Sequence, residues 1–339
     1  MGEGLFSIPL NSLDFEDFSP PFSGIRLLTA DPGFQEILAR LPRLAATDLP
    51  VLITGEPGTG KELVAEALWA LSPRQKRPLH RLNCALLAGE LATSELFGHL
   101  KGAFTGAHHD RLGKFQLAHR ATLFLDEVGE LDSAIQPRLL RVLEQGEVTP
   151  LGSDVPSRVD VRLICATNQD LGRLVAQGRF RRDLYDRLAV LLLNLPPLRE
   201  RGDDVLLLAE HFAEQEAHRF QRPVVGFSAA ARRRLKEYSW PGNVRELRNV
   251  ITRAVLFSQG HLIQAADLVF APRPPAAPVP RSEATLSLPS RPDRETLRTL
   301  LLDNGGNISA TARHLKVCTR TVYRWLKALD LEVTEFRRL

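Results

Sequence analysis

Short apolar runs alternate with amphipathic stretches along the first part of the chain. The runs have the length and continuity of buried parallel strands, and they occupy residues 51–54, 121–125, 161–166 and 190–193. The segments between them have helical spacing, and strands that alternate with helices predict an α/β fold with a parallel sheet. Two prolines at 196 and 197 end this pattern. We therefore expect an α/β subdomain over residues 22–195, after a short leader at 1–21.

The rest of the chain predicts helices. Residues 203–220 and 228–258 have helical patterns only, which indicates a smaller helical subdomain over 196–271. Seven of the 23 prolines fall within 272–292, a composition typical of an extended, semi-rigid linker. Helical periodicity returns at 293–339. The 339 residues are thus expected to hold a two-part domain, a linker and a small helical unit.

The composition is that of a soluble globular protein. Charged residues make up 25% of the chain and hydrophobic residues 44%. The net charge of +4 is mildly basic, so it permits nucleic acid as a partner without requiring it. Three cysteines (Cys84, Cys165 and Cys318) lie far apart and form no CxxC pair. Their number and spacing argue against a disulfide framework and for a reducing cytosol.

Neither a secretory signal nor a membrane helix is indicated. The N-terminus carries Asp14, Glu16 and Asp17 and has no basic region, unlike a signal peptide. The most apolar stretch, 188–195, is far shorter than the ~20 residues that a membrane helix needs. We expect a cytoplasmic protein with no membrane partner.

A glycine-rich loop follows the first predicted strand. Residues 55–61 read GEPGTGK and precede a helical stretch, which is the context that a phosphate-binding P-loop requires. Its glycines let backbone N–H groups converge on phosphate, and Lys61 would reach the β- and γ-phosphates. The alternative, a turn that only resembles a P-loop, is disfavoured by the strand before and the helix after. The expected nucleotide contacts are Gly55, Glu56, Pro57, Gly58, Thr59, Gly60, Lys61 and Glu62. Glu62 stands where a Ser or Thr usually supplies a hydroxyl to Mg²⁺.

Two acids end the strand at 121–125. Asp126 is placed to hold Mg²⁺, and Glu127 to polarise the attacking water as general base. Acids at a strand end are a weak signal alone, since many such junctions carry surface charges. With the P-loop they predict a nucleotide triphosphatase, and the absence of an NKxD signature favours ATP over GTP. No metal other than Mg²⁺ is expected.

A second glycine-flanked motif identifies a family. Residues 95–99 read ELFGH and residues 102–107 read GAFTGA. Glycines on both sides of Phe104 and Thr105 suit a mobile loop with an aromatic tip, rather than a simple hairpin with one buried Phe. The GAFTGA string resembles the signature of sigma-54-dependent transcriptional activators, the bacterial enhancer-binding AAA+ proteins. The resemblance extends from about residue 25 to the C-terminus, and the Glu after the P-loop Lys is also the family's form.

The resemblance implies a fold and roles for this loop. It implies an AAA+ P-loop ATPase with a helical lid, in which the GAFTGA loop contacts sigma-54 and couples nucleotide state to remodelling of the closed promoter complex. Residues 148–158 resemble the family's second, supporting loop. The residues expected to contact sigma-54 are Gly102, Ala103, Phe104, Thr105, Gly106 and Ala107.

The family's switch and sensor positions also map onto this sequence. Asn83 matches the switch Asn that restrains Glu127, although a helix or turn cap is the alternative from the sequence alone. Asn168 matches the sensor I position. Residues 240–247 read WPGNVREL, in which Arg245 matches sensor II and Asn243 is a plausible helix N-cap.

Two arginines match the family's arginine fingers, which act on the nucleotide of a neighbouring subunit. They are Arg181 and Arg187, within the FRxDLxxR spacing. Such a finger neutralises charge in the transition state and can be worth ~10³–10⁵ in rate. Arg182, between them, is expected to be a surface residue.

The C-terminal unit resembles a Fis-type helix-turn-helix. Helices are predicted at 293–303, 308–315 and 319–329, and the last has a buried stripe at Val322, Trp325, Leu326 and Leu329. Residues 313–327 hold five Lys or Arg and no acid, which favours DNA binding over a solvated basic helix. We expect base contacts from Arg320, Thr321 and Arg324, and backbone contacts from Tyr323 and Lys327. A dimer would read half-sites about one helical turn apart.

The resemblance as a whole implies an ATP-dependent activator that forms hexamers, with dimers at rest. Its partners would be sigma-54, RNA polymerase and double-stranded enhancer DNA. Two other classes stay open: a DNA-binding repressor with a vestigial ATPase, and an AAA+ remodeller of another partner. About 21 residues precede the ATPase, too few for the receiver domain that many members carry. Control is then expected from a regulatory protein in trans, from expression level or from oligomerisation, unless the chain is a shortened one.

Overall fold

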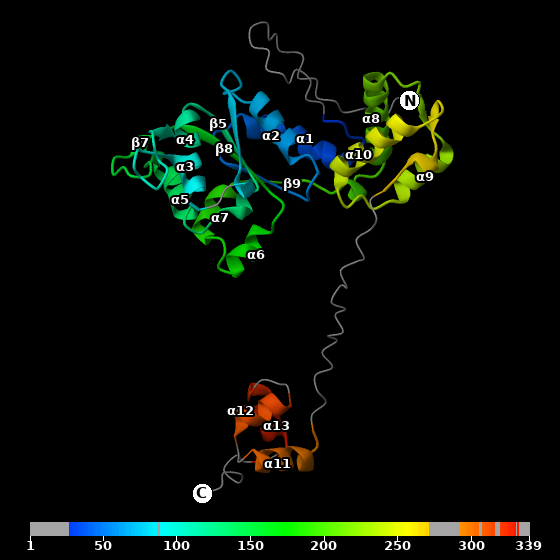
Figure 1. Cartoon of the computed structure of the whole chain (residues 1–339). Helices are drawn as coiled ribbons and strands as arrows, with labels where there is room; N and C mark the ends of the chain where they lie inside the picture. The colour runs from blue at the N-terminus through cyan, green and yellow to red at the C-terminus, as the bar shows by residue number, and fades with distance from the viewer. Residues whose placement is uncertain are drawn as a thin grey trace. The chain divides into compact units, whose positions relative to one another are not determined.

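A computed structural model describes residues 27–86, 89–270, 292–304, 307–315, 319–329 and 331. The chain forms two compact units, Met1–Phe270 and Ala271–Leu339 (Figure 1). The expected leader at 1–21 and nearly all of the expected linker at 272–292 lie outside the described residues.

A five-stranded parallel sheet forms the centre of the first unit. Its strands, in spatial order, are β2 (Leu79–Asn83), β5 (Ala121–Asp126), β8 (Val161–Thr167), β1 (Val51–Thr54) and β9 (Leu191–Asn194). The four predicted strands are confirmed to within one residue at each end. The edge strand β2 was not predicted, because three of the five residues in its sequence Leu-His-Arg-Leu-Asn are polar and none is fully buried.

Helices cover both faces of this sheet (Figure 1). On one face, α1 (Pro32–Ala45) and α2 (Lys61–Ala70) share a core with Ile53 of β1 and Phe124 of β5. On the other face, Leu123 and Leu125 contact a larger core. The helices of that face are α3 (Gly89–Phe97), α4 (Lys114–Leu117), α5 (Gln136–Gln145), α6 (Leu171–Ala176) and α7 (Arg182–Leu188). Alternate residues of β5 therefore serve opposite cores, as the pleat of a strand dictates.

Short pairs and turns connect these layers. Two antiparallel pairs are β3 (Gly98–His99) with β4 (Arg111–Leu112), and β6 (Glu147–Val148) with β7 (Ser157–Arg158). Single 3₁₀ turns are η2 (Cys84–Leu86), η3 (Val128–Glu130), η4 (Leu198–Glu200) and η5 (Ala265–Asp267).

A helical lid follows the sheet. Its helices are α8 (Asp204–Phe220), α9 (Ala229–Glu237) and α10 (Asn243–Phe257), with a short parallel pair of β10 (Gly226–Phe227) and β11 (Leu262–Ile263). Trp240 is fully buried among them, and its indole N–H donates to the carbonyl of Leu235 at 2.9 Å. The helical pattern predicted at 228–258 is therefore two helices that this residue's loop separates.

The second unit is helical. It contains α11 (Arg294–Asp303), α12 (Ile308–His314) and α13 (Thr319–Ala328). Leu297 and Leu301 of α11 share a core with the predicted stripe of α13, in which Val322, Trp325 and Leu326 are buried. The side chains of Arg320, Thr321, Arg324 and Lys327 lie outside the described part of the structure, and Tyr323 is exposed.

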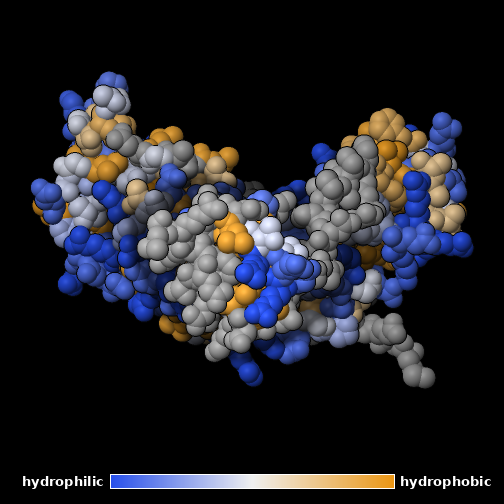
Figure 2. Space-filling view, turned by 90° about the horizontal axis from the view of Figure 1, so that it is seen from below, coloured by the Kyte–Doolittle hydropathy of each residue, from blue (hydrophilic) through white to orange (hydrophobic). Residues whose placement is uncertain are grey.

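Hydrophilic residues predominate on the face drawn in Figure 2, where apolar residues form separate patches. Among the described residues, no helix is both long and apolar enough to cross a membrane.

Candidate nucleotide-binding site

The residues predicted to bind and hydrolyse the nucleotide meet at the carboxyl ends of three adjacent strands. The P-loop follows β1, Asp126 ends β5, and Asn168 follows β8. In open parallel sheets this edge is where ligands bind. Strand order therefore brings together residues that are far apart in the sequence.

The P-loop encloses its own lysine. Lys61 begins α2, and its Nζ donates to the carbonyls of Gly55 at 2.9 Å and Glu56 at 3.3 Å. The side chain is 7% exposed, and this burial lowers the pKa of Lys61. Thr59 is also buried, and its hydroxyl donates to the Glu56 carbonyl at 2.8 Å. The loop thus holds an ammonium group beneath its backbone, as phosphate binding requires.

Glu62 lies beside the edge strand. Its carboxylate accepts a hydrogen bond from the guanidinium of Arg81 on β2, with 3.0 Å between Oε1 and Nη1. Glu62, which stands in place of the usual Ser or Thr, therefore forms an ion pair between α2 and the edge strand β2.

Asp126 suits a magnesium ion. Its Oδ1 accepts the backbone N–H of Glu127 at 3.1 Å, and Oδ2 has no protein hydrogen bond among the described residues. Burial raises the pKa of Asp126, although the charge of Lys61 opposes this. A half-buried carboxylate oxygen with an open lone pair is the kind of hard ligand that Mg²⁺ prefers.

Glu127 has a strained backbone. Its φ is +54°, a left-handed conformation that costs a non-glycine residue roughly 1–3 kcal/mol. Its Oε2 accepts the N–H of Asn168 at 3.1 Å. The side chain of the expected base therefore contacts the backbone of the expected sensor I residue at the end of β8.

Asn83 caps a turn. Its Oδ1 accepts the N–H of Ala85 at 2.9 Å, at the start of η2, which is the alternative that the sequence left open. It pairs with Asp126 in the register of β2 and β5. Among the described residues, no hydrogen bond joins Asn83 to Glu127, so its switch role stays a prediction.

The two expected fingers are exposed, Arg181 at the N-cap of α7 and Arg187 within this helix. The guanidinium of Arg181 makes a two-point ion pair with Asp183, at 3.0 and 2.6 Å, and this pairing lowers the pKa of Asp183. Arg187 donates to the carbonyl of Leu143 at 3.2 Å. Arg182 pairs with Asp186 on the same surface, as expected of a surface residue. In the described structure neither finger is hydrogen-bonded to the P-loop of its own chain.

The prediction that Asn243 is an N-cap is wrong. Gly242 occupies the N-cap of α10, and the fully buried side chain of Asn243 points to the P-loop. Its Nδ2 donates to Glu56 Oε2 at 3.1 Å and to the Pro57 carbonyl at 3.0 Å. Its Oδ1 accepts the N–H of Leu198 at 2.7 Å. The partners lie far away in the sequence, so a local pattern could not identify them.

The segment that holds Arg245 lies against the P-loop, and the sensor II role of this residue stays a prediction. The N–H of Val244 donates to the Gly58 carbonyl at 3.0 Å. A Cβ on Gly58 would lie 2.4 Å from the Gly242 carbonyl oxygen and 3.1 Å from the Cβ of Arg245. The positive charge of Arg245 contributes a lowering of the pKa at both Lys61 and Asp126. Only a glycine at 58 allows the lid to approach this closely.

Two further arginines bind the P-loop and were not singled out in the sequence. Arg199 donates to both oxygens of Glu56, at 2.8 and 2.6 Å, and this holds the pKa of Glu56 below its usual value. Arg201 is 2% exposed, donates to the Thr59 carbonyl at 2.8 Å and lies over the ring of Phe34. Burial lowers the pKa of Arg201 to about 10. The surrounding run of charges resembles ordinary surface sequence, and only its place after Pro196-Pro197 hinted at a role.

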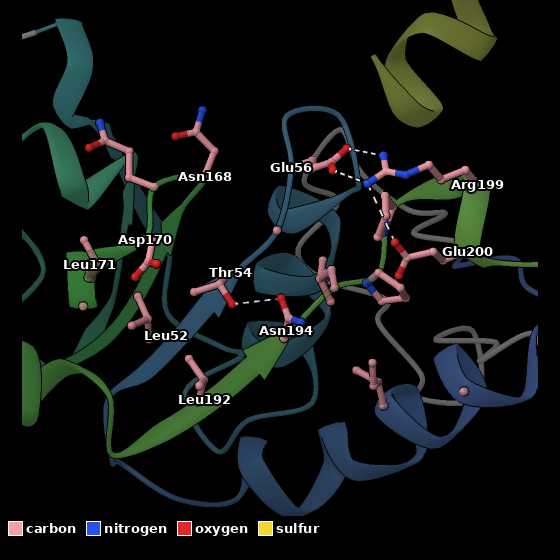
Figure 3. A pocket seen from close by; sticks show the side chains of 18 of the residues that line it. Leu52, Thr54, Glu56, Asn168, Asp170, Leu171, Leu192, Asn194, Arg199 and Glu200 are labelled. Atoms are coloured by element: carbon pink, nitrogen blue, oxygen red, sulfur yellow. Dashed lines mark hydrogen bonds and ion pairs between the residues drawn. The ribbon is translucent and has the colours of Figure 1, made fainter. Parts of the chain in front are cut away.

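A cleft of about 800 Å³ opens beside the P-loop (Figure 3). Leu52 and Leu192 line it from adjacent strands, and Asn168 and Glu56 lie at its polar rim. Thr54 donates to the Asn194 side chain at 3.2 Å within it. Its size falls within the ~300–1,000 Å³ range of small-ligand sites.

The GAFTGA loop is folded onto its base. The Phe104 ring meets the ring of His99 edge-on, with 5.0 Å between centroids, and His99 Nδ1 is 2.6 Å from the Ser94 hydroxyl. Thr105 and Gly106 are exposed at the tip. The loop at 148–158 supports this base, because Leu151 exchanges two backbone hydrogen bonds with the segment 98–100, both 2.9 Å long.

Comparison with known proteins shows the family of this chain. Residues 27–194 match the sigma-54 interaction domain, and residues 199–283 match the AAA+ ATPase lid domain. The anaerobic nitric oxide reductase transcription regulator NorR of Escherichia coli O139:H28 (strain E24377A / ETEC) is 47% identical over 326 residues. That match covers 92% of this chain and 65% of the relative, so the chain spans about two thirds of the relative's length.

Solved structures of NtrX from Brucella abortus are also similar. The complex with ADP has a TM-score of 0.66 and 31% identity, over 91% of this chain and 70% of that one. The complex with ATP has a TM-score of 0.65 and 32% identity, over 90% and 69%. The chain therefore belongs to the sigma-54-dependent transcription regulators, with a sigma-54 interaction domain followed by an AAA+ ATPase lid domain.

Proposed function

We propose that this chain hydrolyses ATP with Mg²⁺ in a ring of subunits and uses the energy to open promoters bound by sigma-54 RNA polymerase. The observation that carries the proposal is the contact between Glu127 and Asn168 at the sheet edge, next to the buried Lys61. A base, a polar sensor and a phosphate-binding ammonium then converge at one sheet edge, and the similar NtrX structures are complexes with ADP and ATP.

Each residue has a defined task in this scheme. The P-loop N–H groups and Lys61 bind the phosphates, and Asp126 would hold Mg²⁺, which neutralises charge on the transferred phosphoryl group. Glu127 accepts a proton from the attacking water, and the hydrogen bond from the Asn168 N–H orients the Glu127 carboxylate. Arg245 contributes positive charge from the lid. Removal of such a base lowers kcat by about 10²–10⁴-fold.

Hydrolysis requires a neighbouring subunit. Arg181 and Arg187 are exposed at the start of α7 and within it, and in the described structure they are hydrogen-bonded to Asp183 and Leu143 rather than to their own P-loop. A finger supplied from the next subunit of a hexamer would complete the charge stabilisation. Dimers would then be a resting form with incomplete sites.

The GAFTGA loop would contact sigma-54. Its tip exposes Thr105 and Gly106 and half-buries Phe104. Gly102 and Gly106, on either side of Phe104 and Thr105, both have positive φ. Its base contacts the 148–158 loop, so movement of that loop reaches the tip directly.

The second unit would bind enhancer DNA through α13. Arg320, Thr321 and Arg324 lie near the start of this helix, where a recognition helix meets base edges. Tyr323 and Lys327 would contact phosphates. Arg324→Ala in the full chain is expected to weaken specific binding by about 1–3 kcal/mol.

The test combines turnover with promoter opening. Purified full chain with ATP, Mg²⁺ and enhancer DNA should hydrolyse ATP and open a sigma-54 promoter, measured by reactivity of unpaired bases. Glu127→Ala should abolish both, whereas Glu144→Ala, an exposed glutamate on α5, should abolish neither. No turnover by the wild type would favour a repressor, and turnover without promoter opening would favour a remodeller of another partner.

A further inference from the structure

One buried amide connects the segment after Glu127 with the arginine-finger segment. Gln136 is the first residue of α5, and its side chain is 1% exposed. Its Nε2 donates to the carbonyls of Leu131 and Arg179, both at 3.0 Å. Its Oε1 accepts the N–H of Arg181 at 2.8 Å. Both donors and the acceptor of this side chain are therefore used.

The Leu131 end of this connection begins at the hydrolysis site. Leu131 directly follows η3, which itself starts after Glu127. Glu127 is hydrogen-bonded to Asn168, and Glu130 of η3 is hydrogen-bonded to the side chain of Gln169. A shift of the sensor segment thus moves η3 and the Leu131 carbonyl that follows it.

The other end fixes a finger's backbone and leaves its charge free to move. Phe180 is 3% exposed, and its N–H donates to the Leu174 carbonyl at 3.3 Å. The guanidinium of Arg181, in contrast, is exposed and pairs with Asp183 two residues away. Buried groups therefore fix the backbone position of Arg181. Its exposed guanidinium can release Asp183 and bind a phosphate instead.

We propose that Gln136 is a positioning residue for the finger Arg181, and that it ties this finger to the segment after Glu127 in the same subunit. The inference rests on the proposed function, in which Arg181 acts on a neighbour's nucleotide. Through this amide, the state of one subunit's site sets the finger that the subunit lends to the next.

The first experiment separates turnover from binding. Gln136→Met keeps a side chain of similar length and removes the carboxamide, and with it all three hydrogen bonds. In the full chain, kcat for ATP is expected to fall at least tenfold while the Kd for ATP stays within twofold. Gln145→Met, an exposed residue on the same helix, is the matched control and should leave kcat within twofold.

The second experiment uses mixed rings. Subunits with Glu127→Ala lack the base but carry an intact finger, whereas Gln136→Met subunits have the base and a misplaced finger. Mixing them should raise ATPase activity several-fold above either protein alone, as should mixing Arg181→Ala with Glu127→Ala.

Three results overturn the inference: unchanged kcat in Gln136→Met, loss of ATP binding in that variant, or no gain on mixing when the Arg181→Ala mixture does gain. A wild-type protein that does not hydrolyse ATP would instead refute the proposed function.

Discussion

The buried side chain of Asn243 in the lid donates a hydrogen bond to the carboxylate of Glu56 in the P-loop, with 3.1 Å between Nδ2 and Oε2. The same amide accepts the N–H of Leu198, where the sheet domain leads into the lid. P-loop, lid and connector are therefore held by one side chain, which makes lid position and phosphate binding interdependent.

Replacement of Asn243 should uncouple the lid. Asn243→Ala leaves the Leu198 N–H and the Pro57 carbonyl without partners, which should lower the free energy of unfolding by about 2–4 kcal/mol. Urea unfolding measures this, and ATP affinity should fall in parallel. Asn249→Ala, an exposed residue on α10, is the control. A loss below ~0.5 kcal/mol, the usual scale of a surface substitution, would contradict the assignment.

The Glu56–Arg199 pair should give a pH-dependent contribution to stability. Arg199 holds the folded-state pKa of Glu56 below 4.5, so the contribution is present above that pH and is lost as pH falls through the folded value. Both side chains are about 40% exposed, so Glu56→Gln should lose only ~0.5–1 kcal/mol at pH 7. The difference between wild type and variant in thermal unfolding should vanish in acid. A difference that persists at low pH would point to lost packing instead.

Gly58 and Gly60 should differ in their tolerance of a methyl group. Both have positive φ, +79° and +101°, so alanine is strained at either position. Only at Gly58 does the new Cβ also meet the lid, 2.4 Å from the Gly242 oxygen, whereas nothing lies within 4 Å at Gly60. Without nucleotide, Gly58→Ala should therefore be the less stable variant by ~1–3 kcal/mol. Equal losses would mean that the lid does not lie against the P-loop.

The folded state of the GAFTGA loop should depend on Ser94. Ser94→Ala removes the hydrogen bond that orients His99, and the Phe104 ring then loses its edge-on contact. Hydrogen exchange at the N–H groups of Ala103 and Ala107 should become several-fold faster, with basal ATPase activity unchanged. Thr93→Ala, whose hydroxyl bonds to Gly89 instead, is the neighbouring control. Equal hydrogen-exchange rates in the Ser94→Ala and Thr93→Ala variants would show that His99 does not support the loop.

Much of the α/β core could be predicted, because its strands are apolar on both faces. The run at 161–166 became β8 almost unchanged, while Leu79–Asn83 was missed because an edge strand need not be apolar. The sequence also located the P-loop, Asp126 and Glu127, since each follows a strand that is itself recognisable.

The contacts between distant segments could not be predicted. Gln136 belongs to no local motif that would single it out, and Asn243 lies at a helix start, where local chemistry favours a cap. Their actual partners, Arg181 and Glu56, lie 45 and 187 residues away and are brought near only by the packed fold. Asn83 is different, because its partner Ala85 is only two residues away. The turn cap that the sequence suggested for Asn83 is the hydrogen bond that forms.

The position of β2 at the edge of the sheet has a mechanical consequence. The chain leaves β2 to build the GAFTGA loop and returns at β5, so the loop is mounted beside the strand with a single neighbour in the described sheet. Sliding an edge strand disturbs one ladder of hydrogen bonds, whereas sliding β1 or β8 would disturb two. A displacement passed from the GAFTGA loop to β2 would therefore strain one ladder of hydrogen bonds, whereas β1, which carries the P-loop, is held between two neighbouring strands.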